Sequence, residues 1–324
     1  MEKLQDLVAV IAAGGEGTRV RPLLQKATQS VFDKPAIYYF LTNVMKAGIG
    51  RALVVCSQAG AGALVELLNT GWEFGMDISI CVGAPYPGAA GVFKTPAVRR
   101  FVEGHRVCLM LDGFYDGGNF DRVVQQAARE AGRTIGCIVL AARLKDAKSV
   151  AETFGWMQEN SRGQVVNIYE KPPLNELRLR PGQKDFLVQT HMYFYGTDVL
   201  KQVDEVQPRK GQYEITDLHN IYRKQEQLKP LILTGMTGKR GLWDDAGTSR
   251  KLLRLAKYVE KRQPSGTTKL IGSPHLQALD NDWIEAKDLK TVAKAYAEKT
   301  KYFKTLDRIA TERISLRKRS RATK

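Results

Sequence analysis

Apolar residues follow two alternating patterns over the first third of the chain. Short runs rich in Val, Ile and Leu predict buried strands, and the stretches between them carry apolar residues every three or four positions, which predicts helices. This alternation predicts an α/β fold with a doubly wound, mostly parallel sheet. The predicted strands cover residues 8–13, 51–56, 77–82 and 106–111, and the predicted helices cover residues 34–47, 61–69 and 92–102.

The pattern changes after the apolar run at 137–141. Three further runs have longer and more polar connections, and they predict strands at 152–158, 165–169 and 186–195. Helical periodicity returns from residue 198, most clearly over 215–226 and 248–261, with two short helices expected within 285–305. The second half is therefore expected to form one side of a cleft and then a set of helices.

Three regions follow from these patterns. A core is expected over residues 1–245, with an inserted β region at about 142–215, and a helical region is expected over 246–312. Residues 313–324 carry several basic residues without interleaved aromatic residues. This composition favours a solvated, disordered tail over a nucleic-acid-binding patch.

A glycine-rich turn follows the first predicted strand. Gly14, Gly15 and Gly17 allow a tight turn whose backbone N–H groups suit phosphate oxygens, and Arg19 and Lys26 add positive charge nearby. Ligands of doubly wound sheets bind at the carboxyl ends of the strands, where this turn is expected to lie. The turn fits neither the Rossmann nor the P-loop fingerprint, so a tight connection without a ligand is the alternative.

The net charge of +16 would favour any polyanion, including a nucleotide, a sugar phosphate, nucleic acid or a membrane surface. No apolar run is long enough to span a membrane and no N-terminal signal segment is recognisable, so we expect a cytoplasmic protein without membrane contact. The four cysteines and four histidines lack metal-ligand spacing. No nucleic-acid-binding motif is present, which disfavours a nucleic-acid partner.

The glycine-rich turn also carries a resemblance. Gly14-Gly15-Glu16-Gly17-Thr18-Arg19, Pro22-Leu23, Lys26 and Phe32-Asp33-Lys34-Pro35 resemble the signature of the sugar-1-phosphate nucleotidyltransferases, with the glucose-1-phosphate thymidylyltransferases as the most similar subgroup. The resemblance covers most of the chain. It implies a Rossmann-like core of the nucleotide-diphospho-sugar transferase type, whose inserted β region binds the sugar.

The resemblance implies roles for individual residues. Asp112 and Asp245 match two aspartates that hold Mg²⁺, although Asp112 could instead cap the helix after Asn119, and Asp244 is an adjacent competitor of Asp245. Arg19, Lys26 and Lys171 match catalytic positions. The nucleotide-binding matches are Gly14, Gly15, Gly17, Thr18, Gly88 and Ala89, and the sugar-phosphate-binding matches are Gly155, Glu170, Lys171, Val188 and Lys210.

The chain also departs from the family pattern. Gly83 stands where the family has a glutamine that pairs with a pyrimidine base, and Ala89 replaces the leucine under that base. Gly113 replaces an asparagine, Lys210 replaces an arginine, and the loop from Arg19 to Lys26 is shorter. A site without its pairing amide loses one means of rejecting the wrong base.

The resemblance implies a reaction of a nucleoside triphosphate with a hexose 1-phosphate to give a nucleoside-diphosphate sugar and pyrophosphate. We expect dTTP and glucose 1-phosphate as substrates, Mg²⁺ as cofactor, and a homo-oligomer, either a dimer or a tetramer. The alternatives are a different nucleotide or sugar phosphate, a catalytically weak regulatory paralogue, and a nucleic-acid-binding protein.

Overall fold

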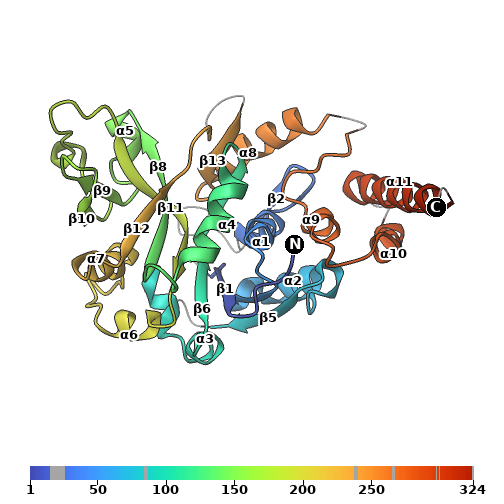
Figure 1. Cartoon of the computed structure of the whole chain (residues 1–324), viewed down its shortest axis with the longest axis horizontal. Coiled ribbons are helices and arrows are strands. Elements are labelled where there is room, and N and C mark those ends of the chain that lie inside the picture. Colours follow the sequence, from blue (N-terminus) through green and yellow to red (C-terminus); the bar gives the residue numbers. More distant parts are fainter. Residues whose placement is uncertain are drawn as a thin grey trace.

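The computed structural model describes residues 1–14, 26–83, 87–236, 240–264, 267–296, 298 and 300–322. Within this part of the chain, nine strands form one mixed sheet in the order β10-β9-β11-β6-β1-β4-β5, with β8 pairing β11 and β12 (Figure 1). Four strands form the parallel half, and β11 joins it antiparallel to β6. The parallel half contains β1 (Leu7–Ala12), β4 (Arg51–Cys56), β5 (Asp77–Val82) and β6 (Arg106–Met110). The remaining strands are β8 (Cys137–Leu144), β9 (Trp156–Glu159), β10 (Val165–Tyr169), β11 (Phe186–Tyr195) and β12 (Leu228–Ile232).

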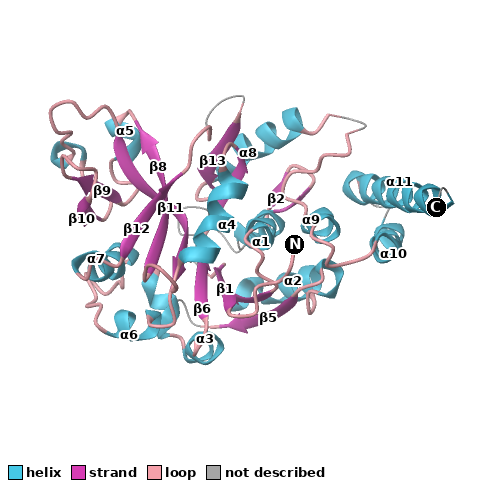
Figure 2. Cartoon of the chain, in the orientation of Figure 1, coloured by secondary structure: helices cyan, strands magenta, loops and turns pink. Residues whose placement is uncertain are grey.

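Helices cover both faces of the sheet because the strands bury apolar side chains on both sides (Figure 2). In β1, Leu7, Ala9 and Ile11 belong to one hydrophobic cluster, and Val8 and Val10 belong to the other. The first cluster includes residues of α1 (Ala36–Lys46), α2 (Gln58–Leu68), α4 (Phe120–Glu130), α8 (Ser249–Arg262), α9 (Pro274–Asp280), α10 (Ala286–Tyr296) and α11 (Lys301–Ala322). The second includes residues of α3 (Pro96–Val102), α6 (Val199–Asp204) and α7 (Ile215–Lys224). The doubly wound α/β fold is thus confirmed.

The rest of the fold comprises a smaller third hydrophobic cluster and a separate two-stranded sheet. The short helix α5 (Ala147–Val150) packs with β9 and β11 in a smaller third cluster that contains Trp156, Phe186 and Val188. A separate two-stranded antiparallel sheet joins β7 (Gly113–Gly117) to β13 (Gly241–Asp245). The sequence patterns did not predict this pair, because neither strand has a long apolar run.

Several predicted elements differ in extent. The predicted helix over 92–102 is a short 3₁₀ helix (η3, Ala90–Lys94) followed by α3, because Pro96 begins a new helix at its first turn. The predicted strand over 152–158 begins only at Trp156. The helix α9 was missed.

The C-terminal basic segment is the clearest correction. Residues 313–322, expected to be disordered, form the end of α11. Leu306, Ile309 and Ala310 anchor this helix in the first hydrophobic cluster, and Arg313 forms an ion pair with Asp280 at 2.9 Å. Arg, Lys, Leu and Ala are good helix formers, so the helix continues beyond its last buried contact. None of the helices in the described part of the chain is long and apolar enough to cross a membrane.

Candidate active site

The carboxyl ends of the parallel strands converge on one edge of the sheet. The Ala13 N–H donates to Val55 O at 2.8 Å, and the Gly83 N–H donates to Cys56 O at 3.1 Å. A Cβ on Gly14 would lie 3.3 Å from the backbone carbonyl carbon of Cys56, so glycine lets the turn pass close to β4. Gly15, Gly17, Thr18 and Arg19, to which the sequence assigned phosphate contacts, lie outside the described residues.

Two aspartates distant in the sequence meet beside this edge. The pairing of β7 with β13 sets Asp245 opposite Gly113, and the Ala246 N–H donates to Asp112 O at 3.0 Å. Both carboxylates come within 4 Å of the place that a Cβ on Gly247 would occupy. Lys26 Nζ lies 3.6 Å from Asp112 Oδ2. Asp112, Asp245 and Lys26 are therefore neighbours in space.

Asp244 and Asp245 point in different directions because successive side chains of a strand alternate between its faces. Asp244 pairs with Arg254 of α8. Asp245 pairs with Lys251, and its Oδ1 accepts the Gly247 N–H at 2.7 Å. Thr248 caps α8 by accepting the Lys251 N–H at 3.2 Å, which fixes the direction of the helix that carries Lys251. Within the described part of the chain, the three atoms nearest to a Cβ on Gly247 belong to Asp245 and Asp112, and none belongs to Asp244.

The electrostatic surroundings keep Asp245 ionised. Burial alone would raise the pKa of Asp245, but the electrostatic interaction with His191, the Lys251 ammonium group and the hydrogen bond from the Gly247 N–H together outweigh burial and lower this pKa. Among the described residues no cluster of three or more His, Cys, Asp or Glu side chains could hold a metal. Mg²⁺ commonly takes one or two carboxylates and completes its shell with substrate phosphates and water, so the Asp112–Asp245 pair fits this ion.

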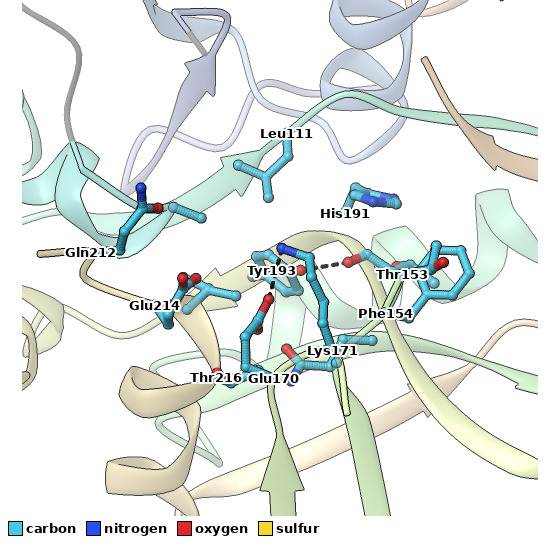
Figure 3. A pocket seen from close by; sticks show the side chains of 16 residues that line it. Leu111, Thr153, Phe154, Glu170, Lys171, His191, Tyr193, Gln212, Glu214 and Thr216 are labelled. Atoms are coloured by element: carbon cyan, nitrogen blue, oxygen red, sulfur yellow. Dashed lines mark hydrogen bonds and ion pairs between the residues drawn. The ribbon is translucent and has the colours of Figure 1, made fainter. Parts of the chain in front are cut away.

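Figure 3 shows a cavity of about 190 Å³. It lies near the aspartates, because His191, which lines it, lies against Gly113, and Gly113 pairs with Asp245. It is smaller than the roughly 300 Å³ at the lower end of sites for drug-sized ligands, which suits a compact ligand such as one sugar ring. Leu111 lines it and precedes Asp112 in the chain. Five of the residues singled out from the sequence also line it: Gly88, Ala89, Gly155, Glu170 and Lys171.

Glu170 and Lys171 lie side by side in the middle of this cavity (Figure 3). Lys171 Nζ lies 2.9 Å from Glu170 Oε1, and the lysine backbone has a φ of 40°. On the other side of the cavity, Gly88 has a φ of +78° and packs against the Tyr213 backbone. The Tyr213 N–H donates a hydrogen bond to Pro87 O at 2.9 Å. These backbone contacts hold the predicted nucleotide-binding loop against the segment that carries Gln212 and Glu214, on the sugar side of the cavity.

Two predicted sugar-phosphate residues do not line the cavity. Val188 is fully buried in the third cluster with Trp156 and Phe186, and its neighbour Gln189 lines the cavity instead. Lys210 is an exposed turn residue, while Gln212 and Glu214 reach the cavity. The structure therefore does not bring Val188 and Lys210 to the site.

Comparison with known proteins agrees with this geometry. Residues 8–262 match the family model described as nucleotidyl transferase. The chain belongs to this family of sugar-1-phosphate nucleotidyltransferases. Glucose-1-phosphate thymidylyltransferase from Neisseria gonorrhoeae is 31% identical to it, and the match covers 90% of this chain and 96% of the relative. The enzyme of the same name from Neisseria meningitidis is 32% identical, over 89% of this chain and 94% of the relative.

Solved structures share the fold. A candidate glucose-1-phosphate thymidylyltransferase from Bacillus anthracis, in complex with sucrose, superposes with a TM-score of 0.64 at 25% identity, covering 81% of this chain and 98% of that one. A UDP-glucose pyrophosphorylase complexed with UDP-glucose has the same TM-score at 17% identity, which shows the fold alone. The protein is thus a nucleotidyltransferase of the nucleotide-diphospho-sugar transferase fold.

A β-bulge in β11 supplies cavity residues that the sequence analysis missed. The pairing register with β8 shifts between Gln189 and Tyr193, so Gln189, Thr190 and His191 all line the cavity instead of alternating. The Tyr115 hydroxyl donates to Thr190 Oγ1 at 3.0 Å and accepts the His191 N–H at 2.9 Å, which holds the bulge. Three consecutive polar residues within an apolar run were the available signal.

The bulge also explains one departure from the family pattern. A Cβ on Gly113 would lie 2.8 Å from the Cβ of His191 and 2.8 Å from Cε2 of Tyr115. The asparagine that the family carries at this position would therefore displace the residues that hold the bulge.

Buried hydrogen bonds link the Gln189 side chain to His219 and then to Tyr195, on the side away from the cavity. His219 Nδ1 lies 2.5 Å from Gln189 Oε1, and His219 Nε2 lies 2.8 Å from the Tyr195 hydroxyl. Burial lowers the pKa of His219 from 6.5 to about 3, so the ring is neutral at neutral pH. Because an amide oxygen only accepts, Nδ1 carries the proton and Nε2 accepts from Tyr195.

We predict that His219 makes stability depend on pH between 6.5 and 3. Its folded pKa lies below the unfolded value, so its contribution is complete above pH 6.5 and declines as the pH falls towards 3. The free energy of unfolding from urea titrations is expected to decrease by about 1.4 kcal/mol per pH unit from this residue alone.

The variant His219→Gln is expected to show a shallower decrease over that range. His275, which is also buried with a lowered pKa, retains its own share in both proteins. The partly exposed His105 provides the control, because His105→Gln is expected to follow the wild-type pH dependence. An unchanged pH profile in His219→Gln would contradict the prediction.

Proposed function

We propose that the protein transfers a thymidylyl group from dTTP to glucose 1-phosphate and releases pyrophosphate. The observation that carries the proposal is the position of Lys26, Asp112 and Asp245 beside a cavity that contains Glu170 and Lys171. A triphosphate and a sugar phosphate need positive groups and a cation, and this arrangement offers two lysines and two carboxylates that would hold a metal ion near a small polar cavity. The relatives named above support the choice of dTTP and glucose 1-phosphate.

The proposed reaction is an in-line displacement. A phosphate oxygen of glucose 1-phosphate bonds to the α-phosphorus of dTTP, and the bond from that phosphorus to the bridging oxygen of pyrophosphate breaks. The attacking phosphate is already ionised at neutral pH, so no general base is needed. Positioning and neutralisation of charge supply the catalysis.

Each residue has a part in this proposal. Lys171 aligns the sugar phosphate, and Glu170 accepts hydrogen bonds from sugar hydroxyls. Lys26 binds the triphosphate together with Arg19, which lies outside the described residues, and both stabilise the pyrophosphate that leaves. Asp112 and Asp245 would hold Mg²⁺, which neutralises phosphate charge when bound.

The direct test measures pyrophosphate release with each deoxyribonucleoside triphosphate and each ribonucleoside triphosphate in turn, against a panel of sugar 1-phosphates. We expect turnover with dTTP and glucose 1-phosphate, dependent on a divalent cation. Binding of nucleotide or nucleotide sugar without turnover of any pair would indicate a regulatory paralogue. Turnover confined to another sugar phosphate would replace glucose in the proposal.

The two aspartates are expected to differ from their neighbour Asp244. Asp112→Asn and Asp245→Asn should each reduce kcat by roughly two powers of ten, because a neutral amide lacks the negative charge with which the carboxylate binds the cation. Asp244→Asn is the matched control, since Asp244 pairs with Arg254 of α8. Direct binding of Mn²⁺, followed by electron paramagnetic resonance, should weaken in the first two variants only. Inactivation by Asp244→Asn with an active Asp245→Asn would reverse the assignment.

Base selection is expected to be weak. Losing a hydrogen bond that distinguishes bases costs about 1–3 kcal/mol of preference, and Gly83 offers no side chain for it. No described atom lies within 4 Å of a Cβ added to Gly83, so a larger residue has room. Gly83→Gln should increase the ratio of kcat/KM for dTTP or UTP over the purine triphosphates by roughly tenfold.

The matched control for this variant is Gly62→Gln. It adds the same side chain at an exposed position of α2 where no described atom lies within 4 Å of the added Cβ. Its base preference should equal that of the wild type. Strong selectivity for dTTP in the unmodified protein would show that another group determines base choice.

A further inference from the structure

One end of the Gln189 side-chain amide faces the cavity and has no hydrogen-bond partner in the part of the chain that the structure describes. Its side chain is buried, with 3% of the residue exposed, and its Oε1 is bound to His219. Its Nε2 is buried and has no hydrogen-bond partner among the described residues. A buried polar group left unpaired costs about 1–3 kcal/mol, so an atom in this position calls for a ligand or a water.

The position of this atom is fixed by its surroundings. His219 and Tyr195 are both fully buried, and their two hydrogen bonds hold the far end of the amide. On the cavity side, a Cβ on Gly155 would lie only 2.8 Å from Gln189 Nε2. The absence of a side chain at Gly155 therefore leaves the amide open to a ligand in the cavity.

A second unpaired polar group lies on the same wall. The Thr216 hydroxyl is buried without a hydrogen-bond partner in the described part of the chain, and Thr216 lines the cavity. Its Cγ2 would lie 3.0 Å from the same Cβ on Gly155. Gln189 and Thr216 thus flank Gly155 with two polar atoms that have no hydrogen-bond partner among the described residues.

The chemistry of these atoms selects the ligand group. An apolar ligand would leave both atoms unpaired. A hydroxyl both donates and accepts, so it satisfies the amide end whichever way the amide lies, and it satisfies the threonine hydroxyl as well. A sugar carries several hydroxyls at the spacing of neighbouring ring carbons and can reach both atoms.

We propose that the Gln189 amide binds a hydroxyl group of the sugar phosphate and determines which sugar the enzyme accepts, with His219 as the residue that positions it. The inference rests on the proposed function, because it concerns the sugar substrate of that reaction. It adds a specificity-determining residue at the β-bulge, where the sequence motifs pointed to Val188.

The test compares glucose 1-phosphate with its 2-, 3-, 4- and 6-deoxy analogues. In the wild type, one deoxy analogue is expected to lose roughly tenfold in kcat/KM, because its missing hydroxyl leaves the amide unpaired. In Gln189→Leu the penalty for that analogue should largely disappear, and glucose 1-phosphate should react about as poorly as the analogue. The exposed Gln225 provides the control, and Gln225→Leu should retain the wild-type profile.

The positioning role of His219 has its own measurement. His219→Gln should raise KM for glucose 1-phosphate while KM for the triphosphate stays unchanged, and it should reduce the penalty for the same deoxy analogue. A purely structural role would lower thermal stability without changing the ranking of the analogues. That result would overturn the role given to His219.

The outcomes separate the two proposals. If the wild type turns over no sugar 1-phosphate, the proposed function fails and this inference fails with it. If the wild type is active and Gln189→Leu keeps the wild-type ranking of analogues, only the inference fails. Should Gln189→Leu not fold, Gln189→Met gives the same comparison, because its thioether fills the space without a hydrogen-bond donor.

Discussion

The antiparallel pairing of β7 with β13 is the constraint on which the site depends. It brings the segment that follows β12 back to the end of β6, so that Asp245 comes beside Asp112. The pairing register also decides which aspartate of the Asp244–Asp245 pair faces the site, because a shift by one residue would exchange their faces. A short sheet of two strands therefore fixes the proposed metal ligands.

The β-bulge in β11 is the second constraint. A regular strand would expose alternate residues to the cavity, whereas the bulge brings three neighbours to it. The Tyr115 hydroxyl stabilises the bulge from β7, and the Tyr193 hydroxyl donates to Thr190 O at 2.5 Å within β11 itself. The residues that shape the sugar side are thus linked to the same two-stranded sheet that positions Asp112 and Asp245.

Much of the fold could be predicted from the sequence, because β-branched runs and helical periodicity reflect burial directly. The strands β4, β5, β10 and β11 have the predicted bounds. The nearness of Lys26 and Asp112 and the cavity positions of Glu170 and Lys171 agree with the family motifs. The cavity positions of Gln189, Thr190 and His191 could not be predicted, since they depend on a register shift in β11 that Tyr115 of β7 and Tyr193 of β11 stabilise.

The charge distribution of the site gives a reason why binding of the triphosphate and binding of the cation should be coupled. Asp112 has Lys26 as a neighbour and Asp245 pairs with Lys251, so each carboxylate already has a cationic partner. Lys251 also lies 5.7 Å from the centre of the Phe154 ring, which lines the cavity. A divalent cation that enters must compete with these lysines for the carboxylates. A triphosphate relieves that competition, because its oxygens offer the lysines new anionic partners. Binding of the cation and binding of the triphosphate should therefore favour each other, and this coupling follows from charge alone.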